Sequence, residues 1–194
     1  MTNLTNPIVL NLDTVQLTDE QFFQLCLNNH ELQFERNANG DLTIMPPTGG
    51  ETSYSNAGLT AQLWVWNESS QLGKVFDSSG GFKLPNGADR SPDVAWIPNE
   101  RWDALVAEQR AKFLPLCPDF AIELRSKSDT LAALRRKMEE YRDNGTRLGW
   151  LLDRVSRSVE IYRPGQAVER LENPATLSGE DVLPGFILNL PSIW

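Results

Sequence analysis

Histidine is the scarcest of the residues that usually carry chemistry in this chain. The 194 residues include a single histidine, His30, and two cysteines, Cys26 and Cys117. Protein zinc sites are built from several His and Cys ligands, and the zinc peptidase and deaminase motifs need at least one histidine with further ligands nearby. The sequence therefore excludes these zinc enzymes. A catalytic triad would depend on His30, which we expect at the frayed end of a helix on the surface.

Long apolar runs are also lacking. No stretch approaches the roughly 18 apolar residues that a membrane-spanning helix needs, and the first 20 residues have neither the basic nor the apolar segment of a secretory signal. The two cysteines lie far apart, each within an apolar stretch, and we expect both to be free thiols in a reducing compartment. The sequence therefore predicts a cytoplasmic protein without a membrane segment.

Positive charge is in short supply. The net charge is −8, from 26 acidic and 18 basic side chains, which is unfavourable for a protein that binds nucleic acid phosphates. The distribution is uneven, because residues 101–147 carry ten basic and eight acidic side chains, whereas the rest of the chain carries eight and eighteen. The most basic part of the chain permits a phosphate-bearing substrate but does not require one.

The length and patterning predict one domain. With 40% hydrophobic residues and no repeat or linker, residues 1–194 are long enough for a single hydrophobic core. The predicted helices span the capping box at Thr18 to Leu27, and residues 51–70, 99–107 and 129–144. The predicted strands are a hairpin over 32–36 and 41–45, followed by 74–77, 81–84, 93–97, 119–125, 147–153 and 159–162. A last strand over 187–190 is expected to close the sheet. Strands interspersed with helices indicate an α/β fold with a twisted mixed β-sheet flanked by helices.

One predicted strand carries a glutamate within an apolar run. In a strand over 119–125, Ala121, Glu123 and Arg125 share one face. A buried carboxylate is costly unless it is paired or bound to a metal. The simplest interpretation of this segment alone is a structural ion pair between Glu123 and Arg125.

A second carboxylate, Asp93, favours a metal site over a structural ion pair. Asp93 follows Pro92 and precedes the apolar run 94–97, which we expect to be a strand buried on both faces. Two carboxylates at the ends of neighbouring strands can hold Mg²⁺, which takes one or two protein oxygens and completes its shell with water and substrate phosphate. Such a metal lowers the pKa of its bound water and offsets charge on the phosphate. Asp93 and Glu123 are therefore candidate metal ligands.

The helix after the second strand offers a cation. Lys137 lies at the border of its apolar face, so that its stem can follow the edge of the core and bring the ammonium group to the strand ends. The apolar face itself is formed by Leu131, Leu134, Met138 and Tyr141. The alternative is that Lys137 belongs to a solvated flank, together with Arg135, Arg136, Glu139 and Glu140.

Several motifs, taken in order, resemble the PD-(D/E)XK nuclease superfamily. More narrowly, they resemble a large bacterial family of restriction-endonuclease-like proteins first catalogued as a domain of unknown function. The matching segments are FE at 34–35, MPP at 45–47, GFKLPNG at 81–87, RSPDV at 90–94, PDFAIELRS at 118–126, KMEEY at 137–141, NG at 144–145, LGWLLD at 148–153 and VEIY at 159–162. The resemblance spans roughly residues 17–190, and it implies a restriction-endonuclease-like core.

The resemblance also implies site residues. Asp93 and Glu123 match the metal ligands, for Mg²⁺ or its substitute Mn²⁺. The superfamily's lysine falls at Arg125, which cannot act as a base at neutral pH but can bind phosphate or a structural partner. Some relatives carry the lysine on the following helix, where Lys137 matches. Glu35 matches an acidic position that accompanies the site, although a purely structural role in the hairpin is an equal alternative.

The implied activity is metal-dependent hydrolysis of phosphodiester bonds in nucleic acid. We expect DNA more than RNA as the substrate, with a specificity that comes from loops of the one domain or from a homodimer. Many relatives have a histidine at the position of Asn56, so the supporting role of this position is open here.

One competing function is a binding or regulatory module that keeps the fold without the activity, which the acidic net charge and Arg125 favour. Another is a homodimerisation domain with Trp102 and Trp194 at its interface; the core is expected to take Trp64, Trp66, Trp96 and Trp150. A non-metal hydrolase is least favoured, since Ser91 and Ser126 lack a G-x-S-x-G context and a histidine base.

Overall fold

The structure is a computed structural model that describes residues 6–194, so the first five residues of the predicted domain lie outside the described part. The helices are α1 (Asp19–Asn28), α2 (Gly50–Ser70), α3 (Asn99–Asp103), α4 (Ala107–Arg110) and α5 (Leu131–Asp143). The strands are β1 (Ile8–Leu10), β2 (Gln33–Arg36), β3 (Leu42–Met45), β4 (Gly73–Asp77), β5 (Phe82–Lys83), β6 (Asp89–Arg90), β7 (Val94–Pro98), β8 (Phe120–Leu124), β9 (Leu148–Asp153), β10 (Ser158–Tyr162), β11 (Glu169–Glu172), β12 (Thr176–Ser178) and β13 (Ile187–Asn189).

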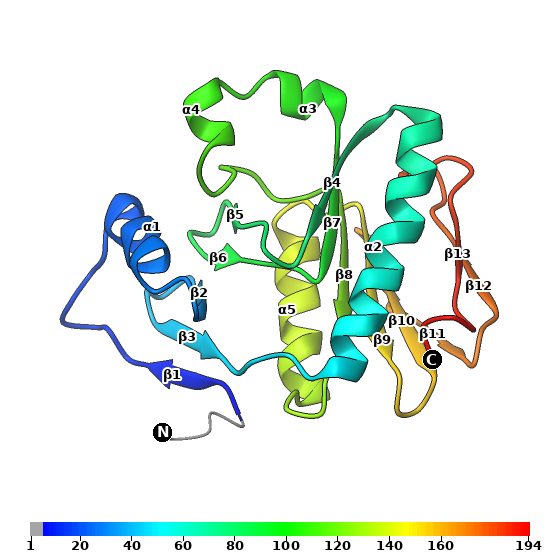
Figure 1. Ribbon diagram of the computed structural model, residues 1–194, viewed down its shortest axis with the longest axis horizontal. Helices are drawn as coiled ribbons and strands as arrows, with labels where there is room; N and C mark the ends of the chain where they lie inside the picture. The colour runs from blue at the N-terminus through cyan, green and yellow to red at the C-terminus, as the bar shows by residue number, and fades with distance from the viewer. Residues whose placement is uncertain (1–5) are drawn as a thin grey trace.

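A six-stranded mixed sheet forms the centre, in the order β11-β10-β9-β8-β7-β4. Its neighbours are antiparallel except for β8 and β9, which are parallel and joined by the crossover helix α5; a parallel pair needs such a connection. The helices α2 and α5 lie on opposite faces of this sheet (Figure 1). The fold is thus the predicted α/β architecture with helices on both faces.

The alternation of β8 sorts its side chains between the two faces. Phe120, Ile122 and Leu124 pack on the side of α2, whereas Ala121 packs on the side of α5. Because successive side chains of a strand point to opposite faces, Glu123 points to the α5 side. The predicted face assignment of Glu123 is therefore confirmed.

A second, five-stranded sheet has the order β1-β3-β2-β6-β5. The predicted hairpin forms its centre, as β2 and β3. Helix α1 covers it, and Phe22 joins Phe34 and Leu42 in a small apolar cluster. The capping box at Thr18 starts α1 as predicted, with the Thr18 side chain accepting the Gln21 backbone N–H.

The segment over 187–190 does not close the central sheet, which corrects the prediction. Strand β13 pairs antiparallel with β12 in a separate two-stranded sheet. Its buried residues Leu188 and Leu190 cover the α2 side of the central sheet. A hairpin satisfies backbone hydrogen bonds within itself, so this apolar run is free to pack face-on rather than extend the sheet edge.

Two smaller predictions are also wrong. The helix expected over 99–107 divides into α3 and α4, because Leu105 turns toward the core and Val106 is extended. Trp64 was expected in the core but is 52% exposed, since α2 turns it away from the sheet. Trp102 and Trp194 instead pack against the two large apolar clusters of their own chain. Both side chains are only partly buried, so an interface at Trp102 and Trp194 stays a prediction.

The scarce residues lie as expected. Cys117 is buried and Cys26 partly buried, and both are free thiols; burial raises the pKa of each to about 11. The side chain of His30 is 87% exposed, just beyond the end of α1. Of the helices in residues 6–194, none combines the length and the apolar character that a membrane crossing requires.

Candidate functional site

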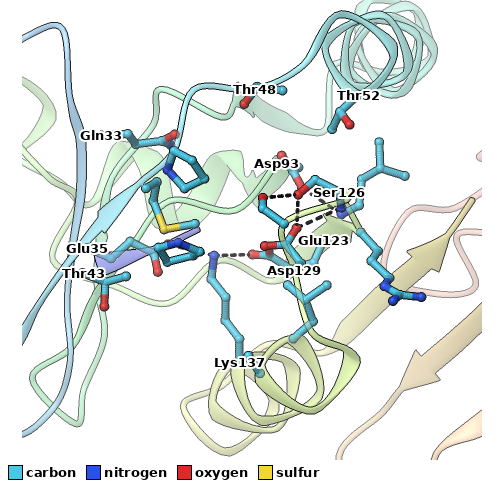
Figure 2. A pocket seen from close by; sticks show the side chains of 18 of the residues that line it. Gln33, Glu35, Thr43, Thr48, Thr52, Asp93, Glu123, Ser126, Asp129 and Lys137 are labelled. Atoms are coloured by element: carbon cyan, nitrogen blue, oxygen red, sulfur yellow. Dashed lines mark hydrogen bonds and ion pairs between the residues drawn. The ribbon is translucent and has the colours of Figure 1, made fainter. Parts of the chain in front are cut away.

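A groove of about 1270 Å³ lies at the end of β7 and β8, with the second sheet along one side. The β2–β3 hairpin and the loop 46–52 border it on one side, and the β8–α5 loop, α5 and the β9–β10 turn on the other. Figure 2 shows Glu35, Asp93, Glu123 and Lys137 in this pocket, contributed by separate elements. All five side chains predicted for the site, the fifth being Arg125, line this groove.

Asp93 and Glu123 face each other across the end of the β7–β8 ladder. Val94 pairs with Ile122 in that antiparallel ladder, so continuing the register places Asp93 opposite Glu123. Asp93 is held firmly, because its Oδ2 accepts the Leu124 N–H at 2.7 Å and its Oδ1 accepts the Asn56 amide at 2.6 Å. The two carboxylates are therefore fixed side by side at a strand end.

Glu123 has one occupied and one unoccupied oxygen. Its Oε1 accepts hydrogen bonds from the Lys137 ammonium at 2.8 Å and from the Tyr141 hydroxyl at 3.0 Å. Its Oε2 accepts none from the part of the chain that the structure describes. One oxygen of Glu123 is thus held in place by α5 while the other is left for a ligand.

Lys137 connects the two sheets. Its ammonium lies 2.7 Å from Glu35 Oε1 and 2.8 Å from Glu123 Oε1, and its side chain is only 13% exposed. The neighbouring Arg136 and Glu139 are exposed. The Lys137 side chain therefore lies at the edge of the core, as one of the two alternatives predicted, and not on the solvated flank of the helix.

Glu35 is part of the same buried network. Besides Lys137, its Oε1 accepts the Ser91 N–H at 3.0 Å, and its Oε2 lies 3.5 Å from the Arg90 guanidinium. Arg90 also donates to Glu140 at 2.6 Å. Glu35 consequently ties the hairpin both to α5 and to the segment that leads into Asp93.

Arg125 does not pair with Glu123, which corrects the simplest reading of the strand. Its guanidinium instead lies 2.8 Å from Asp153 Oδ2. The strand β8 ends at Leu124, and the parallel register of β8 and β9 brings the residue after Leu124 next to Asp153. Within the two roles that the sequence left open for Arg125, this contact is the structural one.

The protonation equilibria of the site follow from burial and charge. Burial raises the pKa of Glu123 to about 8, and the carboxylates of Asp93 and Glu35 add to this rise. Burial also raises the pKa of Asp93. Although burial opposes it, Glu123 and Glu35 raise the pKa of Lys137 above its usual value. Lys137 therefore carries its proton at neutral pH and can act as a cation, not as a base.

The carboxylates of Glu35, Asp93 and Glu123 outnumber the cations beside them, because Glu35 and Glu123 share Lys137 and Arg90 is paired with Glu140. Glu35 and Glu123 are buried and Asp93 is partly buried. No group of three or more His, Cys, Asp or Glu side chains in residues 6–194 is already arranged around a metal position. Mg²⁺ needs only one or two carboxylates.

The Asn56 amide lies beside these carboxylates. Asn56 Oδ1 is buried and has no hydrogen-bond partner among the described residues. The Nδ2 group of Asn56 faces Asp93, and Asn56 is not among the residues that line the groove, so the oxygens offered there are those of Asp93 and Glu123 Oε2. Carboxylate oxygens are hard donors of the kind that fits Mg²⁺.

Sequence reasoning missed several supporting side chains. Tyr141 was assigned only to the apolar face of α5, yet its hydroxyl holds Glu123; its spacing of one turn from Lys137 was the available signal. Asn56 donates to Asp93, so it takes a supporting position despite the missing histidine. Arg90 and Glu140 belong to matching segments of the family pattern, but their contact joins residues 50 positions apart and could not be predicted from the sequence.

Comparisons with known proteins agree with this description. A model of the Uma2 family, described as "Putative restriction endonuclease", matches residues 19–191. The chain is similar in fold to a crystal structure from Anabaena variabilis ATCC 29413, described as a "putative nuclease belonging to DUF820". That similarity has a TM-score of 0.73 at 19% sequence identity and covers 91% of this chain and 97% of the other. The search of curated proteins found no match.

Proposed function

Because the chain belongs to the Uma2 family of the restriction-endonuclease-like proteins, we propose that it is a metal-dependent endonuclease that hydrolyses phosphodiester bonds of nucleic acid, DNA in preference to RNA. The observation that carries this proposal is the pair Asp93 and Glu123, opposed at a strand end with Lys137 beside them. Two carboxylates and a lysine on neighbouring elements suit phosphodiester hydrolysis, in which negative charge develops on the phosphate.

Each side chain then has a role that its contacts support. Asp93 and Glu123 Oε2 would hold Mg²⁺, with Mn²⁺ as a substitute. The ion, when bound, would supply an activated water and Lewis acidity toward the phosphate. Lys137, which remains protonated, offsets negative charge on the phosphate. Glu35 and Tyr141 are positioning residues, since they fix the Lys137 ammonium and the Glu123 carboxylate respectively.

A cleavage assay tests the proposal. Purified protein is incubated with plasmid, single-stranded DNA and RNA in Mg²⁺ or Mn²⁺, beside Asp93→Asn, Glu123→Gln and Lys137→Met variants that keep side-chain size. We expect cleavage by the parent and a loss of at least about 100-fold in each variant, since each removes a charge used in the reaction. Equal cleavage by parent and variants, all prepared in the same way, would assign the activity to a contaminant and sink the proposal.

A binding or regulatory module without cleavage is the second candidate. It is favoured by Arg125, which stands at the superfamily's lysine position but is bound to Asp153, and by Lys137, which already neutralises Glu35 and Glu123. Calorimetric titration with Mn²⁺ separates the two. The nuclease proposal predicts binding that Asp93→Asn and Glu123→Gln abolish, whereas a folded parent that neither binds Mn²⁺ nor cuts supports the module.

We also propose a cytoplasmic location and a homodimer. The free thiols of Cys26 and Cys117 support a reducing compartment. The dimer rests on the expectation that substrate specificity comes from loops of the one domain or from a dimer, because Trp102 and Trp194 pack against apolar clusters of their own chain. Light scattering coupled to gel filtration measures the mass directly, and a mass of one chain at all concentrations would contradict the dimer.

A further inference from the structure

We propose that Arg136 and Arg154, with Lys127, form a subsite for the backbone phosphates of the substrate strand at one end of the groove. This subsite is distinct from the ion-paired Lys137 and lies beside the metal-binding carboxylates. The proposal rests on the proposed function, because it presumes a nucleic acid substrate. It names the part of the chain that binds the phosphates next to the scissile one.

Arg136 and Arg154 are among the few basic side chains that form no ion pair with the described residues. Fourteen of the eighteen Lys and Arg side chains form at least one ion pair. Within residues 6–194, the cations outside any ion pair are Lys74, Arg136, Arg154 and Arg157. Of these four basic side chains, Arg136 and Arg154 line the groove. Arg157 belongs to the same β9–β10 turn as Arg154.

The third cation of the subsite is nearly free. Lys127 lies on the β8–α5 loop, and its one ion pair with the described part of the chain is with Glu51, at 3.5 Å, where both side chains are largely exposed. An exposed pair of this kind contributes little energy, so a phosphate can replace Glu51 readily. The subsite therefore combines three cations from α5, the β8–α5 loop and the β9–β10 turn.

Two arginines of this region have a donor without an acceptor. The Nε groups of Arg125 and Arg154 are buried and find no hydrogen-bond partner among the described residues. A buried donor left without an acceptor is costly. Arg125 is held by Asp153, whereas Arg154 has no ion pair among the described residues, so a phosphate could supply the acceptor that Arg154 lacks; guanidinium and phosphate match in geometry.

The lining of the groove identifies the ligand as the backbone rather than the bases. Proteins that bind single strands through their bases use aromatic stacking platforms. No Phe, Tyr or Trp occurs among the lining residues within 6–194. Tyr54, which is 73% exposed on α2, lies outside this lining. Charge, and not stacking, is thus the interaction that this end of the groove offers.

Binding measured without cleavage tests the subsite. Fluorescence anisotropy with a labelled duplex, in Ca²⁺ or EDTA and over a series of KCl concentrations, gives affinity and salt dependence for the full chain. We expect Arg136→Ala and Arg154→Ala each to weaken binding about tenfold at about 0.1 M salt and to reduce the salt slope by about one. Arg154→Lys, which keeps the charge, should retain most of the affinity.

Lys74→Ala is the matched control, because Lys74 is an exposed, unpaired cation on β4 away from the groove. It should bind as the parent does, and so should Tyr54→Ala. A double variant Arg136→Ala/Arg154→Ala with the parent's affinity and salt slope overturns the subsite, and so does a parent that binds no duplex. Loss of affinity in Tyr54→Ala, or tighter binding of a single strand, would assign the groove to base stacking instead.

The remaining outcomes separate this inference from the proposed function. Arginine-dependent DNA binding without any cleavage supports the subsite and removes the nuclease. Cleavage that is lost in Asp93→Asn but unchanged in the double arginine variant supports the nuclease and removes the subsite. If inorganic phosphate binds the parent through these arginines while the duplex binds the parent and the double arginine variant equally, the ligand is free phosphate and the assignment to the backbone is overturned.

Discussion

At the residue scale, one ammonium group balances the charge of the site. Lys137 is within hydrogen-bond distance of both Glu35 and Glu123, and all three side chains are nearly removed from solvent. Breaking a buried pair by removing one partner costs more than the pair contributes, because the remaining charge is left without compensation. Lys137 is therefore as important for folding as for the proposed chemistry.

We predict that Lys137→Met lowers the free energy of unfolding by about 3–5 kcal/mol at pH 8. The deficit should shrink toward pH 5. Without the lysine, the folded-state pKa values of Glu35 and Glu123 lie above their unfolded values, so the protonated, uncharged forms are available at low pH and stability is lost as pH rises. Urea unfolding at both pH values measures this. A deficit independent of pH would mean that packing, not charge, is lost.

Metal affinity should depend on pH through Glu123. Its pKa near 8 in the metal-free protein means that a metal must displace a proton below that pH. We predict that Mn²⁺ affinity rises up to about tenfold per pH unit between pH 6 and pH 8, and then levels. Calorimetry in buffers of different ionisation enthalpy counts the released protons. Arg125→Ala is the control, since Arg125 is bound to Asp153 and should leave this profile unchanged.

At the scale of elements, the unit β8–α5–β9 assembles most of the site. Strand β8 provides Glu123, and α5 provides Lys137 and Tyr141 on two successive turns of one helix edge. The edge strand β4 supports the other side of the site indirectly, because it pairs with β7, which follows Asp93. The junction between α2 and β4 is tight: the Asn67 side chain bonds both the N–H and the carbonyl of Gly73 and also the Trp96 indole.

We predict that Gly73→Ala destabilises the protein by about 1–3 kcal/mol or more. A Cβ at this position would overlap the Ile97 carbonyl oxygen and the Trp96 indole, and backbone cannot move aside as a flexible side chain can. Gly50→Ala is the matched control, because at the start of α2 a Cβ meets nothing within 4 Å. Thermal unfolding compares the two, and equal midpoints would contradict the tight junction.

At the scale of the whole molecule, the two larger sheets are joined through the site. Glu35 of β2 binds Lys137 of α5, and Arg90 of β6 binds Glu140 of the same helix. Asn86 adds hydrogen bonds to α5 and its C-cap. The second sheet has only a small apolar cluster of its own, so it depends on the central body for stability.

We therefore predict that the described chain unfolds as one cooperative domain. All six tryptophans lie outside the second sheet, so tryptophan fluorescence follows the central body while far-UV circular dichroism follows both parts. Coincident urea transitions by the two probes are the expected result. Glu35→Gln should separate them by weakening the contact between the sheets. Separate transitions in the parent would divide the chain into two domains.

Much of the fold could be predicted from the sequence where local pattern and burial agree. The apolar period of α5, the capping box of α1 and the hairpin β2–β3 rest on neighbouring residues, and all three are confirmed. The short strands β1, β6, β11 and β12 were not predicted. Strands of two to four residues are too brief to show a period. Strand β1 also pairs with a strand more than 30 residues away, whereas β6, β11 and β12 each pair with a strand adjacent in the chain.

The sequence by itself determined which side chains are candidates for the site: one carboxylate before an apolar strand, one within an apolar strand and one lysine at a helix border, in a chain with a single histidine. Those choices are local, because alternation and helical period sort side chains between core and edge. Only the tertiary structure decided the pairing, giving Lys137 to Glu123 and Glu35, and Arg125 to Asp153. Ion pairs depend on the distances between elements, which are set by strand register and by the crossover helix. No local sequence pattern specifies those distances.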